Sequence, residues 1–415
     1  MALEFAAGLS YDSRMKRLYI GLCLAPLLAC SHSTDSDEGL GSDTSFTGSD
    51  ATDEDGAQNG SDGTKDLTVT LPTPVGGYQI RTEPYVVPPA TEVDICTVIR
   101  VEPKAGERFT WANRLESLVS EGTHHMNIFI GQFSFLDGYL GDGASENALG
   151  KPLGQYPCDE LDVMESAFPI FPSQRQNQAI TMPQGVAIPM PLPLVLIASH
   201  HYINPTPQPV RINAILNMET VAASEVSDIA GLVFDVAPTD IPAGSRKVEQ
   251  ATCIFERDVE MVVMSTHNHE WTECATLNRY DGQSGTINAE PFYVNRSWDQ
   301  PPLLNFGAGE YPMKTGDGIH FACHHYNGTD RTLVNDGTAD GEMCVFAAVS
   351  YPLPFSVSEV ETVLSGTDLS ALLGFMDSAL GPCDRLEFTQ PSPWPTGPRI
   401  DAQSTCAGLE QTPSN

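Results

Sequence analysis

Basic residues are scarce in this chain. Among its 415 residues are 21 lysines and arginines against 54 aspartates and glutamates, so its formal net charge is −33. Such a surface repels phosphate backbones, which argues against a nucleic-acid partner. No apolar run reaches the roughly 18 residues of a membrane-spanning helix, and the chain has no Cys-x-x-Cys pair of the kind that builds a zinc ribbon. These absences argue against nucleic-acid binders, integral membrane proteins and zinc ribbons.

Aromatic residues make up only 8% of the chain, but hydrophobic residues reach 41%, enough for sizeable cores. Short apolar or alternating runs recur, and runs of this length are typical of antiparallel β-sandwiches. Helical patterns are scarce. The capping box Ser356-x-x-Glu359 predicts a helix over 357–364, and a second helical turn is expected near 369–376. We therefore predict an all-β protein. The clearest predicted strands are 94–101, 126–130, 194–198, 210–218, 260–264 and 344–349.

Residues 15–30 have the pattern of an export signal. Within residues 15–30, a basic pair and a short apolar stretch lead to Cys30, the pattern of a secretory signal rather than a spanning helix. Leu27-Leu28-Ala29-Cys30 resembles the bacterial lipoprotein box, in which the cysteine is lipidated. We expect an exported lipoprotein held in the outer membrane by lipid on Cys30, facing either the periplasm or the exterior. The alternative is an ordinary signal peptide with an incidental cysteine.

Composition divides the chain into five segments. Residues 31–66 are rich in Ser, Gly and Asp and too poor in apolar residues to offset the entropy of ordering. A less apolar stretch near residue 226 divides the rest into halves of a size that suits one sandwich each. The predicted segments are an upstream extension plus signal peptide (1–30), a disordered acidic linker (31–66), an N-terminal sandwich (67–225), a C-terminal sandwich (226–390) and a tail (391–415).

The histidines give the clearest indication of function, because eight of the ten stand in close pairs. His267 and His269 lie two apart at the end of a predicted strand, so both would face one side and could bind a single metal. Adjacent histidines would face opposite sides. Joint ligation by His124 and His125 therefore needs a bulge, and only one residue of the pair His200-His201 can face a site. The alternative is that these are ordinary core or surface histidines.

Four motifs, taken in order from about residue 93 to 351, resemble a known family. The chain is similar to the copper type II, ascorbate-dependent monooxygenases, which include peptidylglycine α-hydroxylating monooxygenase and dopamine β-monooxygenase. Each motif alone is weak, but four in the same order form a specific pattern. The motifs are Thr123-His124-His125-Met126, His201-Tyr202-x-Asn204-Pro205, His267-x-His269 and Glu342-Met343-Cys344.

The resemblance implies two jelly-roll-like sandwich domains with one copper in each, facing one another across a solvent-filled cleft. Imidazoles suit a copper that changes oxidation state, and a thioether favours Cu(I). The implied activity is hydroxylation of a C–H bond of a small-molecule or peptide substrate, with O₂ and with ascorbate or another electron donor. The C-terminal copper would activate O₂, which makes its ligands catalytic, and the N-terminal copper would supply an electron. The implied ligands are His124, His125 and His201 for the N-terminal copper and His267, His269 and Met343 for the C-terminal copper.

Apart from Cys23 and Cys30 the chain has eight cysteines, an even number that predicts disulfides in an exported protein. The resemblance implies a bond between Cys323 and Cys344, around the Met343 loop, and we expect Cys96 to pair with Cys158 in the N-terminal domain. Three pairings remain open for the other four, of which Cys253 with Cys383 is favoured. The other two cysteines are Cys274 and Cys406.

The pattern departs from the peptide-amidating members at three polar positions, where this chain has Ser265, Val345 and Ala347. Without an arginine, asparagine and tyrosine there, amidation of glycine-extended peptides is not expected. These losses keep two alternatives open, a copper-binding or copper-storage lipoprotein without catalysis and a surface binding module with incidental histidines. The roles of His320, His324 and His325 also stay open, between a surface or supporting position and an auxiliary copper site.

Overall fold

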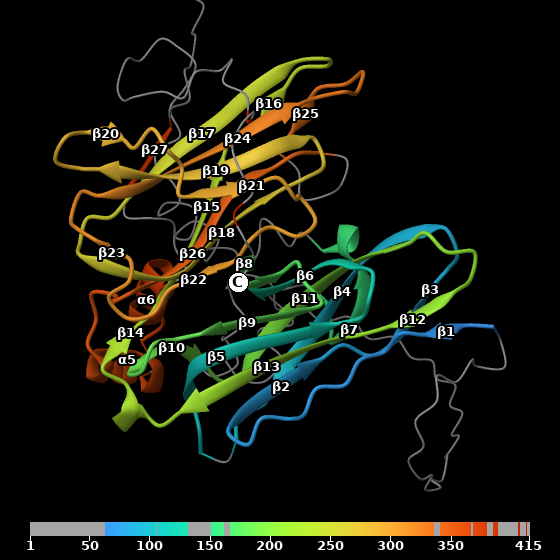
Figure 1. Ribbon diagram of the computed structural model, residues 1–415. Coiled ribbons are helices and arrows are strands. Elements are labelled where there is room, and N and C mark those ends of the chain that lie inside the picture. The colour runs from blue at the N-terminus through green and yellow to red at the C-terminus, as the bar shows by residue number, and fades with distance from the viewer. Residues whose placement is uncertain are drawn as a thin grey trace, which may run out of the picture. The chain divides into compact units, whose positions relative to one another are not determined.

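A computed structural model describes residues 63–104, 106–131, 151–161, 167–335, 341–366, 368–379 and 385–388, together with residues 406 and 412. One compact unit, residues 57–415, contains all of them. The predictions for the signal peptide, Cys30 and most of the tether lie outside these residues. Strands dominate the described part, and nearly all pair antiparallel (Figure 1), which confirms the all-β sandwich prediction. No helix in this part is long and apolar enough to cross a membrane.

Residues 65–229 form two sheets and a small ribbon. The ribbon begins at Lys65, so the folded part starts slightly before the predicted end of the tether. The first sheet contains β14 (Asp228–Ile229), β10 (Val186–Pro191), β5 (Phe109–Val119), β13 (Ala214–Val221) and β2 (Gly77–Arg81), with β9 (Asn177–Thr181) beside β5. The second contains β7 (Gly154–Pro157), β4 (Thr91–Val101), β11 (Leu194–Asn204), β6 (Thr123–Gly131) and β8 (Ala167–Ser173). The ribbon contains β1 (Lys65–Asp66), β12 (Val210–Ile212) and β3 (Tyr85–Val87), and two 3₁₀ turns are η1 (Cys158–Glu160) and η2 (Ala223–Glu225).

From residue 231 onward the strands pair among themselves. One sheet contains β15 (Gly231–Ala237), β26 (Cys344–Tyr351), β18 (Val259–Asn268) and β22 (Leu304–Asn305), with β23 (Pro312–Met313) beside β18. The other contains β20 (Thr286–Ile287), β19 (Thr272–Asp281), β24 (Gly318–Tyr326), β17 (Arg246–Ile254) and β27 (Arg385–Phe388), with β21 (Tyr293–Asn295) beside β19. A two-stranded ribbon pairs β16 (Asp240–Ile241) with β25 (Leu333–Val334).

The two halves repeat one pairing scheme in the same chain order. The strand set β2–β13–β5 corresponds to β15–β26–β18, the set β4–β11–β6 to β17–β24–β19, and the ribbon β12–β3 to β25–β16. A loop repeats as well. After β11 the side-chain oxygen of Asn204 accepts from the backbone and hydroxyl of Thr206, and after β24 Asn327 does the same for Thr329. The strands of these matching sets therefore form two copies of one β-fold.

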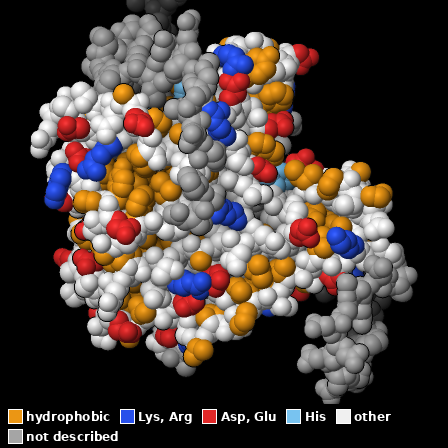
Figure 2. Space-filling model, in the orientation of Figure 1, with side chains coloured by type: hydrophobic (Ala, Val, Ile, Leu, Met, Phe, Trp, Pro, Cys, Tyr) orange, Lys and Arg blue, Asp and Glu red, His pale blue; other side chains and the backbone are white. Residues whose placement is uncertain are grey.

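The main hydrophobic cluster is shared by the two halves. It contains residues of both N-terminal sheets, such as Leu115 and Leu196, together with Val262 and Val349 from the C-terminal sheet of β18 and β26. Two helices, α5 (Val357–Ser365) and α6 (Leu369–Ala379), add residues to the same cluster. The predicted capping box is present at the start of α5. The acidic side chains are scattered over the face seen in Figure 2 and form no single patch there.

One predicted strand was wrong in its extent. The run 210–218 divides at Asn213 into β12 and β13, because the side chain of Asn213 accepts from the backbone of Val69 and donates to its carbonyl. Asparagine side chains compete in this way with regular strand pairing. The division lets the chain leave the ribbon and enter the first sheet.

Candidate metal centre

The N-terminal histidines meet because of a bulge. On β6 and β11 His201 pairs with His125, but the next residue, Tyr202, pairs with Thr123, so His124 is the extra residue. A bulge redirects side chains that would otherwise alternate. As a result the ligand atoms of His124, His125 and His201 lie within 4.8 Å of one another, and all three residues are buried. The bulge that joint ligation requires is thus present.

The ring nitrogens of this cluster fit a bound metal. Nδ1 of His124 lies 3.0 Å from Nδ1 of His201, and the buried Nδ1 of His125 has no hydrogen-bond partner among the described residues. Burial, with repulsion from neighbouring histidines, lowers the pKa of His124 to about 3 and that of His125 well below its usual value. These imidazoles are therefore neutral at pH 7, which is the form that ligates metals.

Two further contacts orient the imidazole rings of His201 and His200. Nε2 of His201 lies 2.6 Å from a carboxylate oxygen of Glu92, which leaves Nδ1 to face the other histidines. A carboxylate on the far nitrogen commonly orients a metal-binding imidazole. His200 faces the other way, with its Nε2 2.8 Å from the hydroxyl of Thr123. As the sequence predicts, only one residue of this pair faces the site.

The C-terminal candidates lie at the paired ends of two strands. Asn268 of β18 pairs with Cys344 of β26, so His269 and Met343 follow at opposing positions. His267 lies two residues before His269, and their ring centroids are 5.2 Å apart. Opposing residues and residues two apart share one face of a sheet, which places all three predicted ligands on one side.

The Nδ1 atoms of both C-terminal histidines already have partners. Nδ1 of His267 lies 3.3 Å from the side-chain oxygen of Gln174, and Nδ1 of His269 lies 3.2 Å from the carbonyl oxygen of Gly341. A metal here would therefore be bound through the Nε2 atoms. Met343 is 3% exposed, so its side chain is shielded from bulk solvent. Two imidazoles and a thioether form a donor set that suits Cu(I).

The two candidate sites approach each other at one pair of histidines. The rings of His125 and His267 are stacked with centroids 6.1 Å apart, and the expected solvent-filled cleft stays a prediction. Trp298 lies against His124 at a centroid distance of 4.5 Å. Gln174 donates to the carbonyl oxygen of Trp298 and thus links this contact to His267. Neither Gln174 nor the role of Trp298 at the N-terminal cluster was recognised from sequence.

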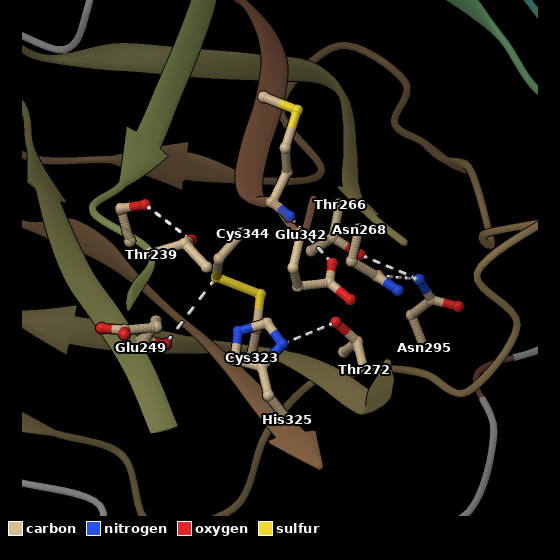
Figure 3. Close-up of a disulfide and its surroundings, with 12 residues drawn as sticks. Thr239, Glu249, Thr266, Asn268, Thr272, Asn295, Cys323, His325, Glu342 and Cys344 are labelled. Atoms are coloured by element: carbon tan, nitrogen blue, oxygen red, sulfur yellow. Dashed lines mark hydrogen bonds between the residues drawn. A yellow bond between two sulfur atoms is a disulfide. The ribbon is translucent and has the colours of Figure 1, made fainter. Parts of the chain in front are cut away.

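Sequence reasoning also missed the role of Glu342, although this residue belongs to the quoted Glu-Met-Cys motif. Its side chain is fully buried between the His269 and Met343 segments. Burial raises the pKa of Glu342 to about 7, while backbone N–H donors act in the opposite direction. Figure 3 shows it near the Cys323–Cys344 disulfide, together with Thr272 and His325.

The described disulfides join Cys96 to Cys158, Cys323 to Cys344 and Cys274 to Cys406, and the first two are the expected pairs. Cys253 is also disulfide-bonded, and its predicted partner Cys383 lies outside the described residues.

The additional histidines have different surroundings. His320 is a core residue that contacts Thr252 and Gln250, and Nδ1 of His325 contacts the hydroxyl of Thr272. A ring nitrogen of His324 lies within 4.8 Å of the sulfurs of Cys274 and Cys406.

Comparisons with known proteins provide no assignment. The chain matches no protein-family model and no curated protein sequence. Among solved structures it is similar to that of infectious bursal disease virus Gt strain, with 10% identity and a TM-score of 0.16, over 70% of this chain and 76% of that chain. The Gx-strain structure has 9% identity and a TM-score of 0.16, over 68% and 74%. With TM-scores this low, neither likeness supports an argument.

Proposed function

We propose that the chain is an exported copper-dependent monooxygenase that uses O₂ and a reductant to hydroxylate a C–H bond of an organic substrate. The observation that carries the proposal is the convergence of three buried histidines, in which Nε2 of His124 and Nδ1 of His125 lack the hydrogen-bond partners among the described residues that buried polar atoms normally have. Close to them lies a His-x-His pair on the same face of a sheet as a buried methionine.

The two donor sets suit complementary tasks. His124, His125 and His201 would hold a copper that passes an electron, and His267, His269 and Met343 would hold the copper at which O₂ is activated. Bound copper would supply the one-electron chemistry that O₂ activation requires. The protein's own contribution is to hold the imidazoles in place. Glu92 orients His201, Gln174 contacts His267, and burial keeps His124 and His125 unprotonated.

A non-catalytic copper-binding lipoprotein is the second candidate, and the substrate side of the C-terminal site favours it. Ser265, at the position of the family's substrate-binding arginine, donates to the carbonyl oxygen of Pro302 and is turned into the structure. Val345 is fully buried. Neither side chain offers the anchor of the peptide-amidating members. This candidate predicts copper binding without reductant-dependent O₂ uptake.

The test is the copper content and the EPR spectrum of the purified chain. Wild type should bind two type II Cu(II) ions, and His267→Ala should bind one. His320→Gln, which alters a buried histidine outside both sites, should keep two. With substrate candidates and a reductant, Met343→Ile should abolish O₂ uptake. Zinc in place of copper, or no bound metal, would exclude the proposed function. Two coppers without O₂ uptake would favour the copper-binding alternative.

A further inference from the structure

Glu342 contacts both segments that carry the candidate C-terminal ligands. Its Oε1 accepts hydrogen bonds from the backbone N–H of His269 (2.6 Å) and of Met343 (2.8 Å). Its Oε2 accepts from the backbone N–H of Trp271 at 3.0 Å. One buried side chain therefore bridges the loop after β18 and the residue before β26, and these are the two segments that a single metal ion would have to join.

The buried carboxylate of Glu342 has hydrogen-bond donors at both oxygens. Placing a carboxyl group away from water is unfavourable unless its oxygens are hydrogen-bonded, and here both oxygens are. The hydroxyl of Thr272 also hydrogen-bonds Glu342, and the same hydroxyl lies 2.9 Å from Nδ1 of His325. His325 therefore supports the hydroxyl that contacts Glu342 (Figure 3). This gives a role to one of the histidines that neither metal site uses.

The duplicated fold provides an internal comparison. In the N-terminal half Val119 pairs with Ala214 as Asn268 pairs with Cys344 in the other half. Counting outward from these pairs, Ser120 corresponds to His269 and Asn213 to Met343, while the preceding residue, Ile212, already lies in β12 of the ribbon. That corner is closed without a carboxylate, because Ser120 donates from its N–H and hydroxyl to the Asn213 carbonyl and accepts from the Asn213 N–H.

In the N-terminal half the same corner of the same fold thus forms through direct hydrogen bonds between Ser120 and Asn213. The fold does not require a buried carboxylate at this place. The half that has the carboxylate is the half with the His-x-His pair and the methionine at the strand ends. This difference indicates that Glu342 serves the candidate ligands and is not needed to form the sandwich.

We propose that Glu342 is a positioning residue, which holds the backbones of His269 and Met343 so that their side chains reach one metal ion. The assignment rests on the proposed function, because it takes these residues as ligands. In this assignment the hydrogen bonds from backbone N–H groups to Glu342 hold the two ligand segments in place, and Thr272 and His325 support the carboxylate. Residues that orient metal ligands typically change metal affinity by about 10- to 100-fold when they are removed.

The test compares the full chain with Glu342→Gln, which keeps the shape of the side chain but directs an amide NH₂ at a backbone N–H. Cu(I) is titrated against a competing chelator, and X-ray absorption reports sulfur bound to copper. We expect at least about tenfold weaker binding at the C-terminal site and loss of the sulfur signal. The N-terminal site serves as an internal reference and should not change. Glu249→Gln is the matched control, because this buried carboxyl on β17 accepts from the backbone N–H of Asp240 and pairs with Lys247 rather than with a ligand residue.

The outcomes separate the inference from the proposed function. Unchanged affinity and an unchanged sulfur signal in Glu342→Gln would overturn the positioning role, as would equal weakening at both sites together with a lower Tm. Wild type that binds two coppers but never consumes O₂ would exclude the monooxygenase and leave the positioning role testable. Wild type without a second copper would exclude both. If Glu342→Gln does not fold, Thr272→Val decides, because it keeps the carboxylate and should give a smaller loss confined to the C-terminal site.

Discussion

At the scale of single residues, buried neutral histidines make the stability of the folded protein sensitive to acid. Desolvation lowers the pKa of His200 and His325 to about 3 and that of His320 to about 4. In the unfolded chain a histidine titrates near pH 6.5. Between these values the unfolded chain binds more protons than the folded one, so the folded state loses stability as the pH falls. The contribution of these residues to stability is complete above about pH 6.5.

His320 allows this effect to be measured without disturbing the candidate metal sites. Its ring contacts Thr252 and Gln250, and a glutamine in its place cannot be protonated in this range. We expect the contribution of His320 to the free energy of unfolding to be about 2 to 3 kcal/mol lower at pH 4.5 than at pH 7.5. Urea unfolding at both pH values should show a smaller acid loss in His320→Gln than in wild type. An equal loss in the two proteins would contradict the assignment.

At the scale of strands, the sequence predicted elements better than it predicted their contacts. Hydrophobic runs identified β4, β6, β11, β18 and β26 because each is bounded by turn-forming residues. Alternation also predicted that His267 and His269 share a face. It could not place the bulge at His124, because the bulge depends on how β6 pairs with β11. Nor could it assign Glu342, since its role depends on backbone groups brought together by tertiary pairing.

The equivalent loops after β11 and β24 lead to a prediction for these elements. The side chain of Asn327 donates to the carbonyl oxygens of Ile241 and Arg331 and accepts from Thr329. Asn204 makes the matching contacts in the other half. Each buried hydrogen bond contributes about 1 kcal/mol, and an orphaned carbonyl costs more. Replacing either asparagine with alanine should therefore lower the free energy of unfolding by about 2 to 4 kcal/mol.

The measurement is urea unfolding of Asn327→Ala, Asn204→Ala and a control, Asn305→Ala. Asn305 is exposed on β22 and its loss should cost less than about 0.5 kcal/mol. Losses of the same size at the two loop positions would support their equivalence. A loss at one position only would mean that the repeated hydrogen bonds have different energetic roles in the two halves.

At the scale of the whole described unit, the duplication was missed from sequence for a physical reason. The pairing scheme depends on which strands adjoin, and many different apolar side chains satisfy it. Only the two His-His-Tyr segments, each followed by an asparagine and a threonine, keep a visible likeness. Each half has its candidate ligands on a different sheet, β6 with β11 in one and β18 with β26 in the other. Divergence of the ligands thus concealed the repeat.

The shared hydrophobic cluster predicts that the two halves unfold together. Leu364 of α5 is 2% exposed and lies in the cluster that contains residues of both halves, whereas Leu277 of β19 is fully buried in a cluster of the C-terminal half alone. Truncating a buried leucine to alanine costs about 2 to 5 kcal/mol. In a cooperative unit, either substitution lowers the same transition, because neither half keeps its full core when the other unfolds.

Calorimetry of wild type, Leu364→Ala and Leu277→Ala tests whether the two halves unfold together or independently. We expect one transition in each protein, displaced to a lower Tm in both variants. Two transitions in wild type, with Leu277→Ala lowering only one, would mean that the halves fold independently and that the shared cluster is a weak contact. In that case the 6.1 Å approach of His125 to His267 would not be held by the core. A single transition would mean that the packing which stabilises the fold also holds the two candidate copper sites together.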